Sequence, residues 1–324
     1  MLTVYVPRGN CLERQVVEPE ASGLPQDAVW LDLVRPTLAE DKLVERLVGT
    51  ALPTREEMQE IEVSSRLYVE DGARFMTATL MCASDTDMPR TTAVTFILAG
   101  NRLVTVRYDD PRPFVLIGNK LTRVCPAGAS GQTILMELLD AVIDRTADIL
   151  ERIAAEVDHV SQQIFDVHAP HGAPFYNSVL QTIGRKGDLT SKVRESLVSI
   201  GRLVLFLANE AQAMGWGKEV GAQLRSMQRD VQSLSDHATY LTNNITFLLD
   251  AMLGVVTIEQ NNVIKLFSVM AVVLLPPTLI ASIYGMNFRH MPELDWTFGY
   301  PIAIVLMMAA AFLPYLYFKW RKWL

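Results

Sequence analysis

Two long apolar segments near the end of the chain dominate its hydrophobic pattern. Residues 266–284 and 299–318 contain no charged side chain. Each segment is long enough, at ~1.5 Å per helical residue, to cross a hydrocarbon layer of ~30 Å. Lys265 precedes the first segment, and Lys319 and Arg321 follow the second, so the positive-inside rule places both of these ends in the cytoplasm. We predict transmembrane helices at 266–285 and 299–318, an external loop at 286–298 and a basic cytoplasmic tail at 319–324.

Shorter runs rich in β-branched and aromatic residues fill the first part of the chain, and turn residues separate them, as is typical of strands. These runs are 2–6, 29–34, 66–69, 74–82, 91–98 and 102–107. Thr37 with Glu40, and Thr54 with Glu57, have the spacing of capping boxes, in which a hydroxyl and a carboxylate bind the free amides at a helix start. The pattern predicts a cytoplasmic α/β domain over residues 1–125.

Long helical periodicity follows over residues 126–265, the predicted cytoplasmic stem. Helices are expected at 133–167 and 175–209, and a third runs from residue 218 into the first apolar segment without a strong break. A helix from 218 to 284 would be ~100 Å long, so it must pack against the two preceding helices or against copies of the same chain. The predicted fold class is an α+β membrane protein with an N-terminal α/β domain, a long-helix stem and two C-terminal transmembrane helices.

Composition narrows the possible functions. The formal net charge is −7 and the pI about 5.3, which argues against a nucleic-acid binder. Cys11, Cys82 and Cys125 are odd in number and widely spaced, so we expect reduced thiols rather than a disulfide framework or a cysteine-based zinc site. His168 and His171 lie in a Pro/Gly-rich turn and are expected to be exposed. No nucleophile elbow, phosphate-binding loop or dinucleotide fingerprint occurs, so we expect neither an enzyme nor an organic cofactor.

A stripe of mostly small and weakly polar residues follows one face of the third helix into the first apolar segment. Its members recur at alternating steps of four and three residues, the heptad spacing of a helix face that contacts other helices. Such a stripe suits simple helix packing in a membrane, or the wall of a pore when copies of the helix surround an axis. The stripe consists of Asp250, Gly254, Thr257, Asn261, Ile264, Ser268, Ala271, Leu275, Thr278 and Ser282.

Three features favour the pore. Pro276 and Pro277 lack amide hydrogens, so two carbonyls at mid-membrane depth lose their helical donors, which is tolerated where neighbours or water satisfy them. Asp250 and Asn261 would form an acidic ring and an amide ring, and such rings attract hydrated cations. At the external end, Asn287 supplies neutral oxygen, which suits Mg²⁺ because this ion gives up its waters reluctantly.

The motif Tyr284-Gly285-Met286-Asn287, the loop Met291-Pro292-Glu293-Leu294 and the basic C-terminus resemble the CorA family of divalent-cation transporters, in particular its enterobacterial-type members. The similarity is specific over about residues 220–324 and looser upstream. The resemblance implies a homopentameric, channel-like transporter of the bacterial inner membrane with both termini in the cytoplasm. It would carry Mg²⁺, and often Co²⁺ or Ni²⁺, inward.

The resemblance also assigns roles by position. Gly285, Met286 and Asn287 match the selectivity motif at the outer mouth, and Ile264 or Phe267 lies near the family's hydrophobic constriction. In family members, Mg²⁺ bound between cytoplasmic subunits holds the pore shut. The expected pore-lining residues are Asp250, Asn261, Ile264, Phe267, Ser268, Ala271, Leu275 and Thr278, with Glu293 in the outer loop.

The sequence departs from the family pattern at two places. Ser226 stands where one branch of the family has a stem aspartate in its sensing site, so Asp230 or Asp236 is the expected substitute for binding regulatory metal. Arg289 and His290 stand where many relatives have an acidic and an apolar residue, which reduces the negative charge of the outer mouth.

Two alternative functions stay open. A ZntB-like zinc transporter shares the architecture, although such relatives usually vary the middle residue of the motif, which is Met286 here. A tail-anchored signalling or scaffold protein, whose stem transmits domain motions, would need no ion pathway at all.

Overall fold

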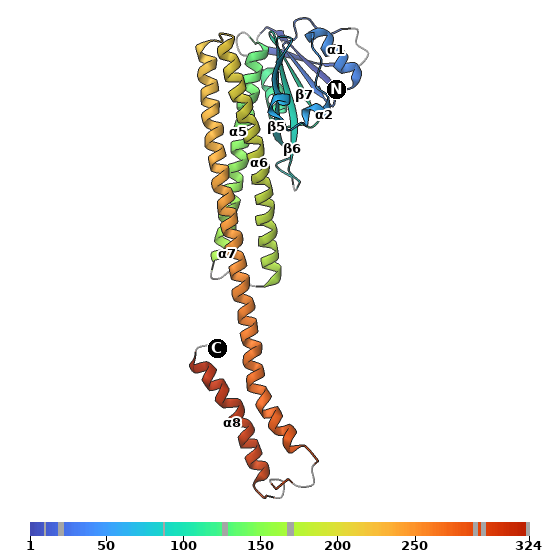
Figure 1. Ribbon diagram of the computed structural model, residues 1–324. Coiled ribbons are helices and arrows are strands. Elements are labelled where there is room, and N and C mark those ends of the chain that lie inside the picture. The colour runs from blue at the N-terminus through green and yellow to red at the C-terminus, as the bar shows by residue number, and fades with distance from the viewer. Residues whose placement is uncertain are drawn as a thin grey trace. The chain divides into compact units, whose positions relative to one another are not determined.

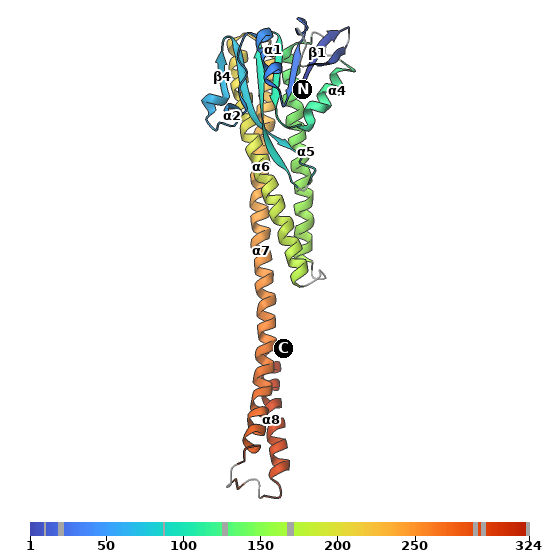
Figure 2. The same ribbon diagram turned by 90° about the vertical axis from the view of Figure 1, so that its right-hand side faces the viewer.

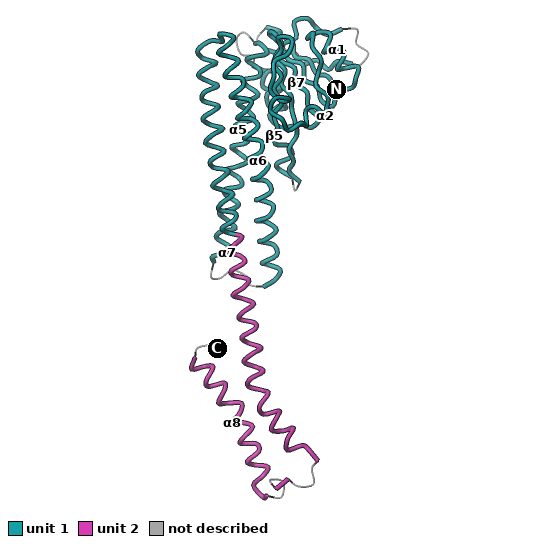
Figure 3. The backbone as a smooth tube through the Cα atoms, in the orientation of Figure 1, with its two compact units in different colours: residues 1–248 teal, residues 249–324 magenta. Residues whose placement is uncertain are grey.

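The computed structural model of the protein describes residues 1–9, 11–18, 23–86, 88–124, 129–166, 172–287, 291–292 and 296–321. It contains two compact units, Met1–Leu248 and Leu249–Leu324, which are coloured separately in Figure 3. The first unit combines a β-sheet with helices, and the described part of the second is helical (Figure 1).

A seven-stranded sheet forms the centre of the first unit, with strand order β2-β1-β3-β7-β6-β5-β4. In the described chain, β3 and β7 pair in parallel and the other neighbours pair antiparallel. The strands are β1 (Leu2–Arg8), β2 (Cys11–Val17), β3 (Trp30–Val34), β4 (Leu67–Glu70), β5 (Ala73–Cys82), β6 (Arg90–Ala99) and β7 (Arg102–Arg107).

Short helices cover one face of this sheet. They are α1 (Leu38–Val48), α2 (Arg55–Met58) and α3 (Val63–Arg66). Val44 of α1 and Met58 of α2 are buried in one cluster with Val4 of β1 and Val104 of β7. Both predicted capping boxes are present at the starts of α1 and α2, so the two helices begin where their hydroxyl and carboxylate pairs satisfy the free amides.

Helices α4 (Arg112–Leu121), α5 (Gly131–Phe165) and α6 (Ala173–Ala213) lie on the other face of the sheet (Figures 1 and 2). The start of α5 sits directly on β7, because a Cβ on Gly131 would lie 2.4 Å from the backbone of Arg102 and Leu103. Within the first unit, α7 (Lys218–Tyr284) packs along α6: a Cβ on Gly201 would lie 3.3 Å from Val231.

The second unit contains the rest of α7 and α8 (Gly299–Trp320), two helices long and apolar enough to cross a membrane. Helix α7 continues through Pro276 and Pro277 and ends at Tyr284, as predicted. The α+β fold class, with an N-terminal α/β domain, long helices and two C-terminal apolar helices, is therefore confirmed. The finer division into cytoplasmic, transmembrane and external segments stays a prediction.

The structure also corrects the sequence reading. Strand β2 and helix α4 were not predicted, and the three long helices begin or end within a few residues of expectation. Cys11 and Cys82 are free thiols, as predicted, with Cys82 buried. Cys125, His168 and His171 lie outside the described residues.

Candidate ion-conducting helix

All members of the stripe lie on α7 in the second unit, and all are exposed in the protomer. The exposure of the large apolar members is substantial, at 61% for Ile264 and 64% for Leu275; Phe267, at the edge of the stripe, is 63% exposed. Asp250, Asn261, Ser268, Ala271 and Thr278 are likewise exposed. The structure thus places every predicted pore-lining residue on one helix and leaves that face uncovered within the protomer.

The opposite face of the same helical segment is more covered. Val269 is buried, and Val273, Pro276, Ile280 and Tyr284 are half-buried. At about 100° per residue, these positions lie between roughly 80° and 160° around the helix from Ser268, whereas the stripe is centred near Ser268 itself. The stripe is therefore a separate face of α7, available to other copies of the chain.

Hydroxyl groups of the stripe are bonded to their own helix. Ser268 donates to the carbonyl of Ile264 at 2.8 Å, and Thr278 donates to the carbonyl of Leu275 at 2.8 Å and to that of Leu274 at 3.1 Å. Because each hydroxyl hydrogen is directed back to the backbone, the oxygen lone pairs remain available on the exposed side. Such oxygens can accept hydrogen bonds from the waters of a hydrated cation.

The proline pair removes two donors from the middle of this helix. Pro276 and Pro277 have no amide hydrogen to give to the carbonyls of Val272 and Val273. Val272 is exposed and lies on the side of the stripe, whereas Val273 is half-buried on the other side. One carbonyl that lacks its helical donor therefore adds a further oxygen beside the stripe.

The motif Gly285-Met286-Asn287 begins where α7 ends. The amide of Gly285 donates to the carbonyl of Ala281 at 3.0 Å, and a Cβ on Gly285 would lie 3.1 Å from that same oxygen. Met286 and Asn287 follow with exposed side chains. Glycine thus permits the tight final turn that presents these two residues. Glu293, Arg289 and His290 lie outside the described residues.

The two candidate regulatory aspartates occupy the part of α7 in the first unit. Asp230 and Asp236 are both exposed, and Gln232 donates to Asp236 at 3.0 Å. Burial raises the pKa of Asp140 on α5 above its ordinary value, and the carboxylates of Asp144, Glu137 and Asp230 raise it further. Asp230 therefore belongs to an acidic surface, but the described residues contain no group of three or more His, Cys, Asp or Glu side chains arranged to hold a metal ion.

One electrostatic cluster was missed by sequence reasoning. Asp85, between β5 and β6, accepts hydrogen bonds from Arg145 at 2.6 Å, from Arg112 at 3.1 Å and from Arg152. The hydrogen bond from Arg152 is the largest influence on the pKa of Asp85, which falls to about 2 although burial opposes the shift. The cluster fixes the β5–β6 connection to α5.

The chain is similar to known proteins over its whole length. The family model described as "CorA-like Mg2+ transporter protein" matches residues 25–320. The chain is 36% identical over its full length, and over the full length of each relative, to the magnesium transport proteins CorA of Salmonella typhimurium and Escherichia coli K12.

Solved structures show the same fold. The CorA magnesium transporter from Methanocaldococcus jannaschii aligns with a TM-score of 0.77 at 16% identity, over 100% of this chain and 99% of that chain. The cytoplasmic domain of ZntB from Vibrio parahaemolyticus aligns with a TM-score of 0.57 at 10% identity, over 78% of this chain and 96% of that chain. At these identities the likeness concerns the fold alone.

Proposed function

Because the chain belongs to the CorA-like Mg²⁺ transporter family, we propose that it transports Mg²⁺ across a membrane through a pore lined by α7. The observation that carries this proposal is the exposed stripe of oxygen-bearing and small residues on a helix apolar enough to span a bilayer. Curated relatives that match the whole chain are named as magnesium transport proteins, which supports a transporter rather than an enzyme.

The pore is proposed to require five copies of the chain. The family resemblance implies a homopentamer, and the uncovered face of α7 supports an assembly in which copies meet along the stripe. Leu275 and Ile264, each more than 60% exposed in the protomer, would then be covered by neighbouring helices or would narrow the axis. Ile264 or Phe267 forms the proposed hydrophobic constriction, which closes by dewetting.

Ion selection is proposed to rest on contacts between oxygens of the pore and the water shell of the cation. Gly285, Met286 and Asn287 would form the outer mouth, and the oxygens of Thr278, Ser268 and the carbonyl of Val272 would contact the ion's waters. Mg²⁺ retains its hydration shell more strongly than most cations, so outer-sphere contacts favour it. Co²⁺ and Ni²⁺ are proposed as further cargo because they also accept oxygen ligands.

Regulation is proposed to involve cytoplasmic Mg²⁺ at the acidic surface of the first unit. Asp230 and Asp236 are the candidate ligands on α7, and the raised pKa of Asp140 supports an accumulation of negative charge beside Asp230. A divalent cation bound between subunits would neutralise this repulsion and hold the closed state, so a sufficient internal supply would limit uptake.

The proposed location is the bacterial inner membrane, with both termini in the cytoplasm and the loop 286–298 outside. A doubly charged ion that enters at ~100 mV, inside negative, gains ~4.6 kcal/mol at ~2.3 kcal/mol per charge. The membrane potential alone can therefore drive uptake.

The direct test is growth rescue of a bacterium that lacks Mg²⁺ uptake. We expect the wild type to restore growth in low Mg²⁺ and Asn287→Ala to fail at equal membrane abundance. Rescue by Asn287→Ala that equals wild-type rescue would contradict the assignment of the outer mouth. Absence of rescue by the wild type would contradict Mg²⁺ uptake itself.

A liposome assay separates the alternatives. Purified protein under an inside-negative voltage should pass Mg²⁺ faster than Zn²⁺, whereas a ZntB-like carrier would show the opposite order, and a scaffold protein would pass neither. Asn261→Ala should change the flux or the preference among Mg²⁺, Co²⁺ and Ni²⁺. Asn262→Ala is the matched control, because its side chain is also exposed but lies about 100° around α7 from Asn261.

A further inference from the structure

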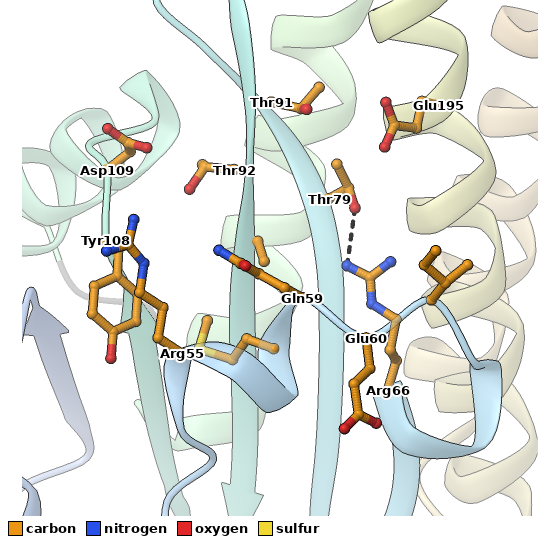
Figure 4. A pocket seen from close by; sticks show the side chains of 13 residues that line it. Arg55, Gln59, Glu60, Arg66, Thr79, Thr91, Thr92, Tyr108, Asp109 and Glu195 are labelled. Atoms are coloured by element: carbon orange, nitrogen blue, oxygen red, sulfur yellow. Dashed lines mark hydrogen bonds between the residues drawn. The ribbon is translucent and has the colours of Figure 1, made fainter.

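A cavity of about 340 Å³ lies in the first unit, remote in sequence from the stripe on α7. Figure 4 shows it between the segment that carries α2 and α3, strands β5 and β6, and helix α6. The threonines at its back, Thr79 and Thr92, are buried. The proposed transport mechanism uses no residue of this cavity.

Arg66 is the most unusual group in the cavity. Its guanidinium donates to the hydroxyl of Thr79 at 2.9 Å, whereas its Nε is buried and has no hydrogen-bond partner. Arg66 forms no ion pair with any described carboxylate. Burial lowers the pKa of Arg66, and the carboxylate of Glu195 offsets this only in part. A partly dehydrated guanidinium with a free donor is costly unless an acceptor binds it.

Arg55 and Gln59 supply further donors to the cavity. Arg55 lies over the ring of Tyr108, with its guanidinium carbon 5.0 Å from the ring centroid, and it too forms no ion pair among the described residues. The stacking fixes the plane of this guanidinium and leaves its N–H groups available at the edge. Figure 4 shows the amide of Gln59 between Arg55 and Arg66. Two guanidinium groups, with the amide of Gln59 between them, therefore line the cavity.

Three carboxylates also line the cavity, and Figure 4 shows Glu60 beside Arg66, with Asp109 and Glu195 farther along its two flanks. Asp109 is already paired, at 2.8 Å from Arg90 and 3.8 Å from Arg35. Glu195 on α6 forms no ion pair in the described chain and remains an available acceptor. The cavity thus combines N–H donors with two carboxylates, Glu195 and Glu60, that form no ion pair in the described chain.

We propose that this cavity binds inorganic hydrogen phosphate. Arg66 and Arg55 bind its anionic oxygens through charge-assisted hydrogen bonds, and Gln59 donates a further one. Glu195 accepts the hydrogen bond of the P–OH group, which an isosteric sulfate dianion lacks. The volume lies at the lower end of small-ligand pockets, ~300–1,000 Å³, which suits a single phosphate group.

The test is calorimetric titration of the full-length protein in detergent, without divalent cations, with sodium phosphate and with sodium sulfate at pH 7.5. We expect saturable binding of phosphate and binding of sulfate weaker by about tenfold, because sulfate leaves Glu195 without its partner. Arg66→Gln and Arg55→Gln should each weaken phosphate binding by about tenfold or more. Arg123→Gln, an exposed arginine outside the cavity, should change nothing.

Glu195→Gln tests whether the cavity recognises the P–OH group of phosphate or only attracts anions by charge. This change removes a negative charge, so a merely electrostatic site would bind both anions more tightly and keep their ratio. A glutamine amide still accepts the P–OH hydrogen bond through its oxygen but can also donate to sulfate through its nitrogen, so the proposed hydrogen bond predicts instead that the preference for phosphate over sulfate narrows. The proposal is overturned if wild type binds neither anion, binds both equally, or keeps its phosphate affinity in both arginine variants. Arg55 is exposed, and its replacement removes the stack on the Tyr108 ring. If Arg66→Gln does not fold, phosphate binding by Arg55→Gln and Glu195→Gln still tests the proposal.

Discussion

Asp85 gives the sharpest test of how the sheet is fixed to the long helices. It receives hydrogen bonds from Arg145 and Arg152 of α5 and from Arg112 of α4. The Arg145 side chain is only 15% exposed, whereas Asp85 is 44% exposed. The Asp85→Asn variant keeps the shape of the side chain and removes the charge that the three guanidinium groups share.

The pKa of Asp85 sets the magnitude. A fall of the Asp85 pKa from its ordinary value of 3.8 to about 2 corresponds to roughly 2.4 kcal/mol at ~1.36 kcal/mol per pH unit. Because Asp85 is 44% exposed, solvent screening reduces this contribution to roughly 1 kcal/mol. The folded pKa is lowered, so the stabilisation is fully present above pH 3.8 and is lost as pH falls through about 2.

Thermal unfolding of the full-length protein in detergent measures this effect. We expect Asp85→Asn to lower Tm by about 2–4 °C, with a constant difference from wild type between pH 7 and 5 and a smaller one below pH 4. Asp148→Asn is the matched control, because Asp148 lies 4.0 Å from the same Arg145 but is 67% exposed, and its loss should change Tm by less than about 1 °C. An equal effect of the two variants, or a difference that grows as pH falls, would refute the reasoning.

Three further predictions concern packing and the pore. Gly131→Ala should destabilise the protein by about 1–3 kcal/mol because its Cβ would overlap the backbone of β7, whereas Gly184→Ala, with open space around the new Cβ, should stabilise it by about 0.5–1 kcal/mol; thermal unfolding compares them. Thr278→Val should reduce Mg²⁺ flux in liposomes by about tenfold and Thr278→Ser should retain it, and equal fluxes would contradict an oxygen ring at this level. Pro276→Ala restores a donor for the carbonyl of Val272 and should reduce flux more than Pro277→Ala; the reverse order would count against a role for that carbonyl.

Local signals in the sequence predicted much of the fold. Capping boxes predicted the starts of α1 and α2, because both partners lie within four residues and act on the backbone next to them. Apolar periodicity predicted the long helices, and the uncharged apolar run that stops before Gly285 predicted the end of α7 at Tyr284.

Elements that depend on distant partners were missed. Strand β2 carries Glu13 and Arg14 in its centre and is stabilised by its register with β1, in which Leu2 pairs with Val17. As an edge strand with an exposed polar face, it has too few apolar positions to indicate a strand by itself. Helix α4 is short. Its apolar residues Phe114 and Ile117 are buried because the helix packs on the sheet, and the local sequence does not show that packing.

The candidate functional residues also fall into those that local spacing predicted and those that depend on distant partners. The stripe on α7 was visible because one helix carries all its members at regular spacing, whereas the arginine cavity unites residues of α2, α3, β5 and α6. Arg66 and Glu195 are separated by more than a hundred positions, so no local motif could associate them. The cluster around Asp85 was missed for the same reason, because its arginines follow 27 to 67 positions later.

The backbone gives a stronger energetic argument for a water-filled axis than the hydroxyls do. Ser268 and Thr278 already donate to their own helix, so their burial among lipid tails or neighbouring helices would be tolerated. The carbonyl of Val272 cannot be satisfied in this way, because Pro276 has no hydrogen to give and lipid offers none. An unpaired carbonyl in hydrocarbon costs several kcal/mol, and that cost would be repeated in every copy of the chain. Water or the hydration shell of an ion removes it, so the proline pair favours a wet pathway over a dry helix interface.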